Sequence, residues 1–125
     1  MRFMMIMIPA VSEEDWPSDP AEMAELPEFT AMGKYNDELN KAGVLLALDG
    51  LQPSSKGARV AFAGGKPSVT DGPFTEAKEV IGGYWLIQAR SKEEAVEWAS
   101  RCPANDGDVI EVRQVFEMSD FDGAA

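Results

Sequence analysis

The first half of the chain has a pattern of apolar and polar positions that predicts a strand, a helix and a second strand. Residues 1–8 are apolar at nearly every position, and residues 44–51 are similar, as in strands buried in a sheet. Between them we expect a proline-rich loop over 9–20 and a helix that begins near Pro27 and ends before Gly43. The residues that recur on one face of this helix are Met32, Tyr35, Leu39 and Ala42.

A hairpin is predicted in the middle of the chain. Its strands, 58–63 and 67–70, flank Gly64-Gly65-Lys66, a sequence typical of a tight connection. Asp71-Gly72-Pro73-Phe74 predicts a further turn, and residues 76–79 are expected to form a short helical turn. These segments separate the first strand–helix–strand unit from a second one.

The second unit repeats the same order of elements. A strand is predicted over 81–90, in which alternate residues face opposite sides of a sheet. Ser91 and Glu94 have the spacing of a capping box, which predicts the start of a helix that ends before Pro103. Residues 109–116 are the last predicted strand.

This order of elements predicts an α+β fold, with one ferredoxin-like antiparallel sheet and both helices on one face. The other face would stay uncovered, although the first two strands have few polar positions to expose. Because an uncovered apolar face needs a partner, we expect a homodimer whose sheets pack together into a dimeric α+β barrel. A single domain is expected over 1–117, with 118–125 as a flexible C-terminal tail.

Composition excludes several kinds of site. The 125 residues include no histidine and one cysteine, so a Ser-His-Asp triad, a His-ligated metal and a Cys-based zinc site are ruled out. We therefore expect no metal and no cofactor. The net charge of −11 argues against nucleic acid or a membrane surface as a partner. The cysteine usage and the lack of a long apolar run favour a cytoplasmic location.

The negative charge is concentrated near the N-terminus. From Phe3 to Gly33 the chain has no Lys or Arg. The acids of this segment are Glu13, Glu14, Asp15, Asp19, Glu22, Glu25 and Glu28. They are typical of a solvated loop and of the first turns of a helix, where carboxylates suit the helix dipole. The alternative is a surface that binds a partner.

Several motifs resemble the DGPF-type proteins of the YCII-related family. The resemblance is strongest from Asp71-Gly72-Pro73-Phe74 to Gly82-Gly83, continues through Arg101-Cys102-Pro103, and covers roughly residues 1–116. It implies a dimeric α+β barrel with a ferredoxin-like protomer. DGPF-type proteins are often encoded beside extracytoplasmic-function sigma factors, so the resemblance also implies a regulatory or accessory role.

Some YCII relatives have a His–Asp pair in a cleft, for which an enzymatic role is proposed. Aligning Gly43 with the glycine after their first helix places the histidine at or near Met32, and the aspartate at Cys102. Met32 does not titrate, and Cys102 lies at a helix C-terminus, where the dipole raises the pKa of a thiol. The acid–base chemistry of the pair is therefore not expected here.

Six residues are candidates for a binding or catalytic cleft, namely Asp71, Glu79, Tyr84, Arg90, Glu111 and Arg113. Asp71 either caps its own turn or places a carboxylate at the mouth of a cleft. Glu79 precedes Gly82-Gly83, which favour a β-bulge or the close approach of a ligand.

The last predicted strand adds a pair of opposite charges. Glu111 and Arg113 share one strand face, either as an ion pair that sets the register or as a site for an anion. If the strand that contains Tyr84 and Arg90 is adjacent, these polar groups would form one cleft.

Two functions remain open from the sequence. The first is a small dimeric module without enzymatic activity, which binds a small molecule or serves as an accessory protein. The second is an enzyme that acts on a small metabolite with Asp, Glu, Tyr and Arg groups and without histidine. The absence of a catalytic constellation favours the first, and nothing in the sequence indicates a substrate.

Overall fold

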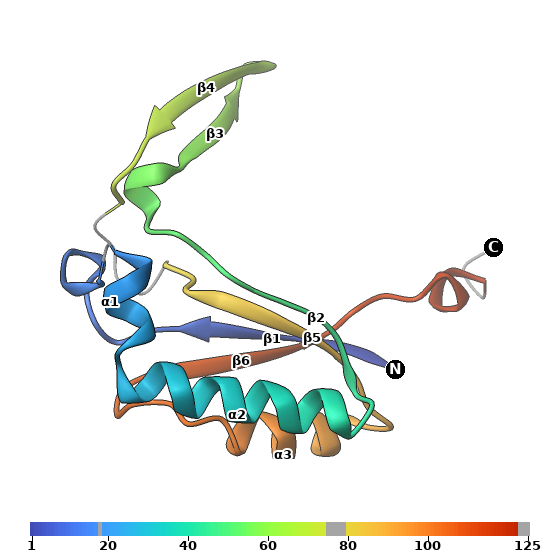
Figure 1. Ribbon diagram of the computed structural model, residues 1–125. Coiled ribbons are helices and arrows are strands. Elements are labelled where there is room, and N and C mark those ends of the chain that lie inside the picture. The colour runs from blue at the N-terminus through green and yellow to red at the C-terminus, as the bar shows by residue number, and fades with distance from the viewer. Residues whose placement is uncertain (18, 75–79, 123–125) are drawn as a thin grey trace.

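Two β–α–β units interleave to form the main body of the protein in the computed structural model, which describes residues 1–17, 19–74 and 80–122 (Figure 1). The elements of this body are β1 (Arg2–Ile8), α1 (Pro20–Ala24), α2 (Pro27–Lys41), β2 (Leu45–Gly50), β5 (Gly83–Gln88), α3 (Lys92–Ser100) and β6 (Val109–Gln114). The strands form one antiparallel sheet in the order β2-β5-β1-β6. The predicted α+β fold with an antiparallel sheet and helices is confirmed.

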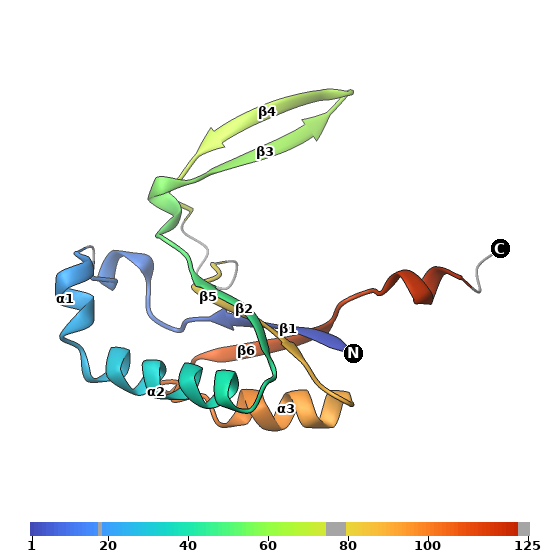
Figure 2. The same cartoon turned by 45° about the vertical axis from the view of Figure 1, so that its right-hand side comes forward.

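The helices α2 and α3 lie on the same side of the sheet (Figure 2). The core between them and the sheet consists of Phe3, Met5, Tyr35, Leu39, Trp85, Ile87, Ala89 and Ala95. The Tyr35 and Trp85 rings meet edge to face at 5.8 Å. The Tyr35 hydroxyl also donates a hydrogen bond to the Trp98 carbonyl (2.6 Å), so α2 is tied to α3. The predicted alternation along 81–90 is confirmed, because Trp85, Ile87 and Ala89 all enter this core.

Local signals explain where the helices begin. The Ser91 hydroxyl accepts a hydrogen bond from the Glu94 amide at the start of α3, as predicted (3.1 Å). The Glu94 carboxylate accepts from the Arg90 amide (3.3 Å), one residue before the partner that a capping box normally has. The short helix α1 begins at the end of the predicted loop 9–20, because the Asp19 carboxylate accepts from the Ala21 amide (3.0 Å).

The predicted hairpin forms a separate two-stranded sheet of β3 (Ala58–Ala63) and β4 (Lys66–Asp71). Gly64 and Gly65 connect the strands with φ angles of +58° and +76°, the left-handed conformations that a type I′ turn requires. Every residue of both strands is exposed. The hairpin stands away from the main sheet, on the side opposite the helices (Figure 1, Figure 2).

The C-terminal segment also leaves the main body. Part of the predicted flexible tail 118–125 has a defined conformation, since Met118–Phe121 forms a single 3-10 turn, η4. The Phe116 and Phe121 rings contact each other across it, with centroids 5.3 Å apart. The turn lies beyond the end of the sheet that is farthest from the foot of the hairpin (Figure 1, Figure 2).

Candidate functional site

The face of the main sheet opposite the helices, called the open face below, is apolar at its centre. Alternate residues of β1 and β5 point to it, and the half-buried apolar ones are Met4, Ile6, Ile8 and Leu86. No helix of the described residues covers these side chains (Figure 2). Of the candidate polar residues, Tyr84, Glu111 and Arg113 lie beside this apolar centre, on the strands that flank β1.

Tyr84 lies at one margin of the open face, on β5. It is directly opposite Asp49 of β2, and its hydroxyl donates a hydrogen bond to the Asp49 carboxylate (2.7 Å). This hydrogen bond and the negative charge of Asp49 raise the pKa of Tyr84 above its ordinary value. The hydroxyl therefore stays protonated at neutral pH, which suits hydrogen bonding and not proton abstraction.

A hollow of about 170 Å³ lies on the helix side of the same strand ends, between β2, β5 and the helix α2, whereas the Tyr84 and Asp49 side chains alternate to the open face. Its walls are mainly apolar and include Met7, Met32 and Leu48. On its floor, a side chain at Gly83 would come within 2.8 Å of the Asp49 carbonyl, so this glycine lets β2 approach β5. The close approach expected at Gly82-Gly83 is thus made by a backbone, and the bulge of this pair lies on β2, between Leu45 and Ala47.

Glu111 and Arg113 form an ion pair on β6, with 3.3 Å between Arg113 Nη1 and Glu111 Oε2. They do not join Tyr84, because β1 lies between β5 and β6. Ile6 is opposite Tyr84 on one side and Glu111 on the other, so the two polar groups are two strand spacings apart, about 10 Å. The single polar cleft, which required adjacent strands, is not formed within one chain.

The other three candidates have different surroundings. Arg90 follows β5, and its amide helps to cap α3. Asp71 is the exposed last residue of β4. Within the described ranges, no group donates a hydrogen bond to the Asp71 carboxylate, so the predicted cap of its own turn is not formed. Glu79 lies outside the described residues.

Ser54 holds the Asp-Gly-Pro-Phe turn in place of Asp71. The Ser54 hydroxyl accepts a hydrogen bond from the Phe74 amide (2.9 Å) and donates one to the Glu13 carboxylate. The Ser54 amide also donates to Glu13 (2.9 Å). A side chain at Gly72 would lie 1.8 Å from the Ser54 carbonyl, so only glycine fits there. Glu13 and Ser54 are 41 residues apart, and no local pattern could have paired them.

Met32 and Cys102, the positions to which the His–Asp pair of some relatives aligns, do lie together. The Cys102 sulfur is 3.9 Å from the sulfur of Met32. Burial, followed by the negative charge of Asp108, raises the pKa of the Cys102 thiol to about 11. A thiol with this pKa is neutral and a weak nucleophile at neutral pH. The two positions are therefore in contact but have no group that transfers protons.

Comparison with known proteins agrees with these motifs. Residues 1–119 match the YCII-related domain. The chain belongs to the YCII-related family. The resemblance inferred from Asp71-Gly72-Pro73-Phe74 and the following glycines is thus confirmed.

A relative of this YCII-related protein is an uncharacterized protein of Rhizobium meliloti (strain 1021). It is 37% identical over 59 residues, which are 47% of this chain and 48% of the relative. The chain thus spans about half the length of the relative it matches. As a separate finding, none of the helices in the described ranges is both long enough and apolar enough to cross a membrane.

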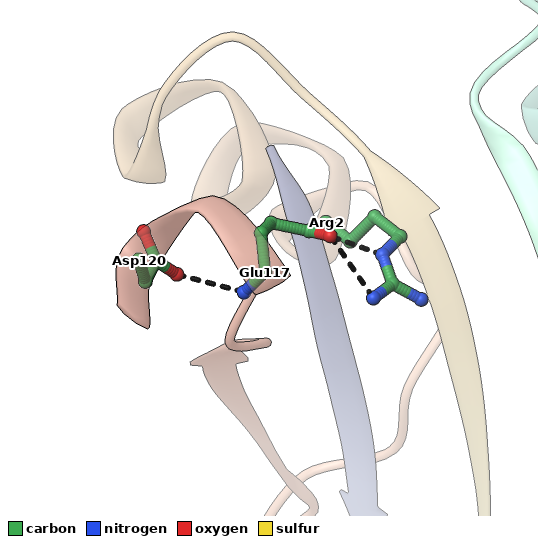
Figure 3. Close-up of polar contacts among 3 residues, drawn as sticks. All are labelled: Arg2, Glu117 and Asp120. Carbon is green, nitrogen blue, oxygen red and sulfur yellow. Dashed lines mark hydrogen bonds and ion pairs between the residues drawn. The ribbon is translucent and has the colours of Figure 1, made fainter. Parts of the chain in front are cut away.

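One ion pair of this YCII-related chain was not anticipated. Arg2 donates two hydrogen bonds to the Glu117 carboxylate, from Nε (2.7 Å) and Nη2 (3.1 Å) (Figure 3). The Glu117 amide donates in turn to the Asp120 carboxylate (2.7 Å). The hydrogen bonds from Arg2 hold the pKa of Glu117 below its ordinary value. The pair joins the start of β1 to η4, two segments 115 residues apart.

Proposed function

We propose that this YCII-related protein is a homodimeric binding module, in which two ferredoxin-like sheets pack by their open faces into an α+β barrel. The observation that carries the proposal is the apolar centre of the open face. Met4, Ile6 and Leu86 are bordered by polar groups and left without a cover within the described chain. Water is an unfavourable neighbour for such a surface, whereas a second copy would bury it.

The accessible surface of the chain supports the same assembly. It is 8931 Å², whereas a compact monomer of 13.6 kDa is expected to expose about 6,600 Å². Each chain thus exposes about 2,300 Å² more than a compact monomer would. Obligate homodimers bury roughly 2,000–5,000 Å² in total, so an excess of this size per protomer is what a stable dimer would remove.

The hollow at the ends of β2 and β5 supports the binding role. Its walls are mainly apolar and include the polar side chain of Asn36, a combination that suits a small molecule held by a few polar contacts. The contact of Met32 with Cys102 supports binding rather than catalysis, because neither group exchanges a proton near neutral pH.

The enzyme alternative rests on the Tyr84–Asp49 pair. Such an enzyme would use the protonated hydroxyl as a hydrogen-bond donor to its substrate, with the Asp49 carboxylate beside it. The accessory role, beside an extracytoplasmic-function sigma factor, is supported by the likeness to DGPF-type proteins. A cytoplasmic location stays a prediction from the sequence.

Sedimentation tests the dimer directly. At micromolar concentration the chain should sediment at twice its mass of 13.6 kDa. Leu86→Glu places a charge at the centre of the open face and should give monomers with unchanged helix content by circular dichroism. Val96→Glu, on the exposed side of α3, is the matched control and should remain dimeric. A wild-type chain that sediments only as a monomer would overturn the proposal.

A further inference from the structure

The hairpin of β3 and β4, called the arm below, has one apolar face without a cover in the described chain. The strand register places Val60 opposite Val69 and Phe62 opposite Pro67 on this face. Phe62 is 76% exposed and Val69 is 67% exposed. An isolated two-stranded hairpin is marginally stable in water, so an arm of this kind gains from a surface to pack on.

The C-terminal segment, residues 116–122, is a second exposed apolar surface. Phe116 is 74% exposed and Met118 is 82% exposed, and the Phe121 ring lies beside Phe116. This segment is held in place, because Glu117 is bound to Arg2 and its amide begins the η4 turn (Figure 3). It therefore presents its apolar side chains in a defined position.

The two surfaces have opposite charge. The arm, residues 58–71, contains two bases, Arg59 and Lys66, and one acid, Asp71, so its net charge is +1. The C-terminal segment contains three acids, Glu117, Asp120 and Asp122, and no base. The arm is thus slightly basic in a chain with a net charge of −11, and the C-terminal segment has the opposite charge and a similar apolar surface.

The two surfaces also lie where a dimer would bring them together. The arm rises on the side of the open face from one end of the sheet, and the C-terminal segment lies beyond the other end (Figure 1, Figure 2). Consider two open faces that pack together, with the two-fold axis between the sheets and perpendicular to the strands. Each end of one sheet then lies over the opposite end of the partner's sheet. The arm of each copy then passes beside the C-terminal segment of the other.

We infer that the arm is a dimerisation element that packs its apolar face on the C-terminal segment of a second copy of this chain. This inference rests on the proposed open-face dimer and specifies its axis. It explains why an arm with Phe62 and Val69 on its surface occurs in an acidic chain, and why Arg2 holds η4 in place. Each dimer would contain two such contacts.

Cross-linking tests the contact. In a chain with both Val69→Cys and Met118→Cys, one thiol is on β4 and the other in η4, and these segments leave the main body at opposite ends of the sheet, so a disulfide between the two thiols should join two copies. Mild oxidation should give a covalent dimer on a non-reducing gel. Each single variant should give at least tenfold less, because Cys102 has a raised pKa and reacts slowly. No covalent dimer from the double variant, or equal amounts from a single variant, would overturn the inference.

A pair of substitutions on one strand measures the contribution of the arm. Phe62→Ser should raise the dimer dissociation constant at least tenfold, whereas Ala61→Ser, on the other face of β3, should leave it unchanged. Both positions are exposed, so neither change should affect the fold of the protomer. If Leu86→Glu breaks the dimer but Phe62→Ser does not, the open-face dimer stands and the role of the arm is refuted.

Discussion

Single residues of this protein are constrained by backbone proximity more than by side-chain chemistry. Gly72 shows this most clearly, because any side chain there would collide with the Ser54 carbonyl. This carbonyl is a backbone group and cannot rotate away as a flexible side chain could. The glycine of the Asp-Gly-Pro-Phe motif is therefore required by the close packing of two backbone segments. Asp71 is the residue of the motif that could take part in acid–base or binding chemistry. It is exposed and accepts no hydrogen bond from the described part of the chain.

Gly72→Ala should lower the free energy of unfolding by about 1–3 kcal/mol, the usual cost of overpacking at a site that cannot relax. Urea denaturation at a fixed protein concentration measures this loss. Gly33→Ala is the matched control, because Gly33 lies inside α2 with no atom near the added methyl group. There the better helix propensity of alanine should stabilise the protein by about 0.5–1 kcal/mol. Equal stability of the two variants would contradict the explanation of the motif.

The element whose position depends most on one interaction is η4. Its start is tied to β1 by Arg2 and Glu117, and the Glu117–Asp120 hydrogen bond closes the turn. Because this ion pair is partly exposed, we expect it to make a small contribution to stability and mainly to position the segment. The ion pair thus determines where the C-terminal segment presents its side chains.

The Arg2–Glu117 pair predicts a defined dependence on pH. The folded-state pKa of Glu117 lies below its ordinary value, so the stabilisation is present at neutral pH. It should be lost as the pH falls below about 4.3, the ordinary value, and through the lower folded-state pKa. Glu117→Gln should therefore show a smaller loss of melting temperature between pH 7 and pH 3 than the wild type.

The variant Arg2→Gln tests the same ion pair from its other residue. It removes the same interaction from the other side, so its pH profile should match that of Glu117→Gln, and the double variant should add nothing. A Glu117→Gln profile identical to that of the wild type would show that the pair does not contribute to stability.

At the scale of the whole molecule, the main sheet divides the protein into a closed side and an open side. The helices bury Phe3, Met5 and Ile87 on one face, whereas Met4, Ile6 and Leu86 on the other lack a cover in the described chain. The hollow at the ends of β2 and β5 lies on the closed side, next to α2. A ligand that binds there would contact only the native state, and it would therefore stabilise the whole protein.

A thermal-shift screen against small metabolites tests this binding role. A ligand present at about 100 times its dissociation constant should stabilise the protein by about 2.7 kcal/mol and raise the melting temperature. Asn36→Leu removes the polar side chain that α2 contributes to the hollow, so the shift should shrink or vanish while the dimer remains. A ligand whose shift is unchanged in Asn36→Leu binds elsewhere and would contradict the assignment of this hollow.

Much of the fold followed from local pattern. The alternation of Trp85 and Ile87 with Tyr84 and Leu86 placed one strand face in the core. The Gly64-Gly65 pair predicted the hairpin, because only residues that tolerate positive φ make such a turn. These signals succeed because the conformation of each short segment is determined largely by its own residues.

The candidate site depended on contacts between distant residues, and the sequence alone could not supply them. Tyr84 was identified, but its partner Asp49 is brought opposite it by strand pairing. Glu111 and Arg113 were identified as a pair, but the insertion of β1 between β5 and β6 separates them from Tyr84. Glu13 and Ser54 met only through folding of the loops.

The sequence by itself determined the two long helices and the strands, the apolar strand faces, the absence of histidine chemistry and the family. The tertiary structure alone decided which strands are neighbours, which acids are structural, and where the arm and the C-terminal segment stand relative to the sheet. The physical reason is that helix, strand and turn preferences act over a few residues, whereas strand order and side-chain partners depend on the packing of the whole chain.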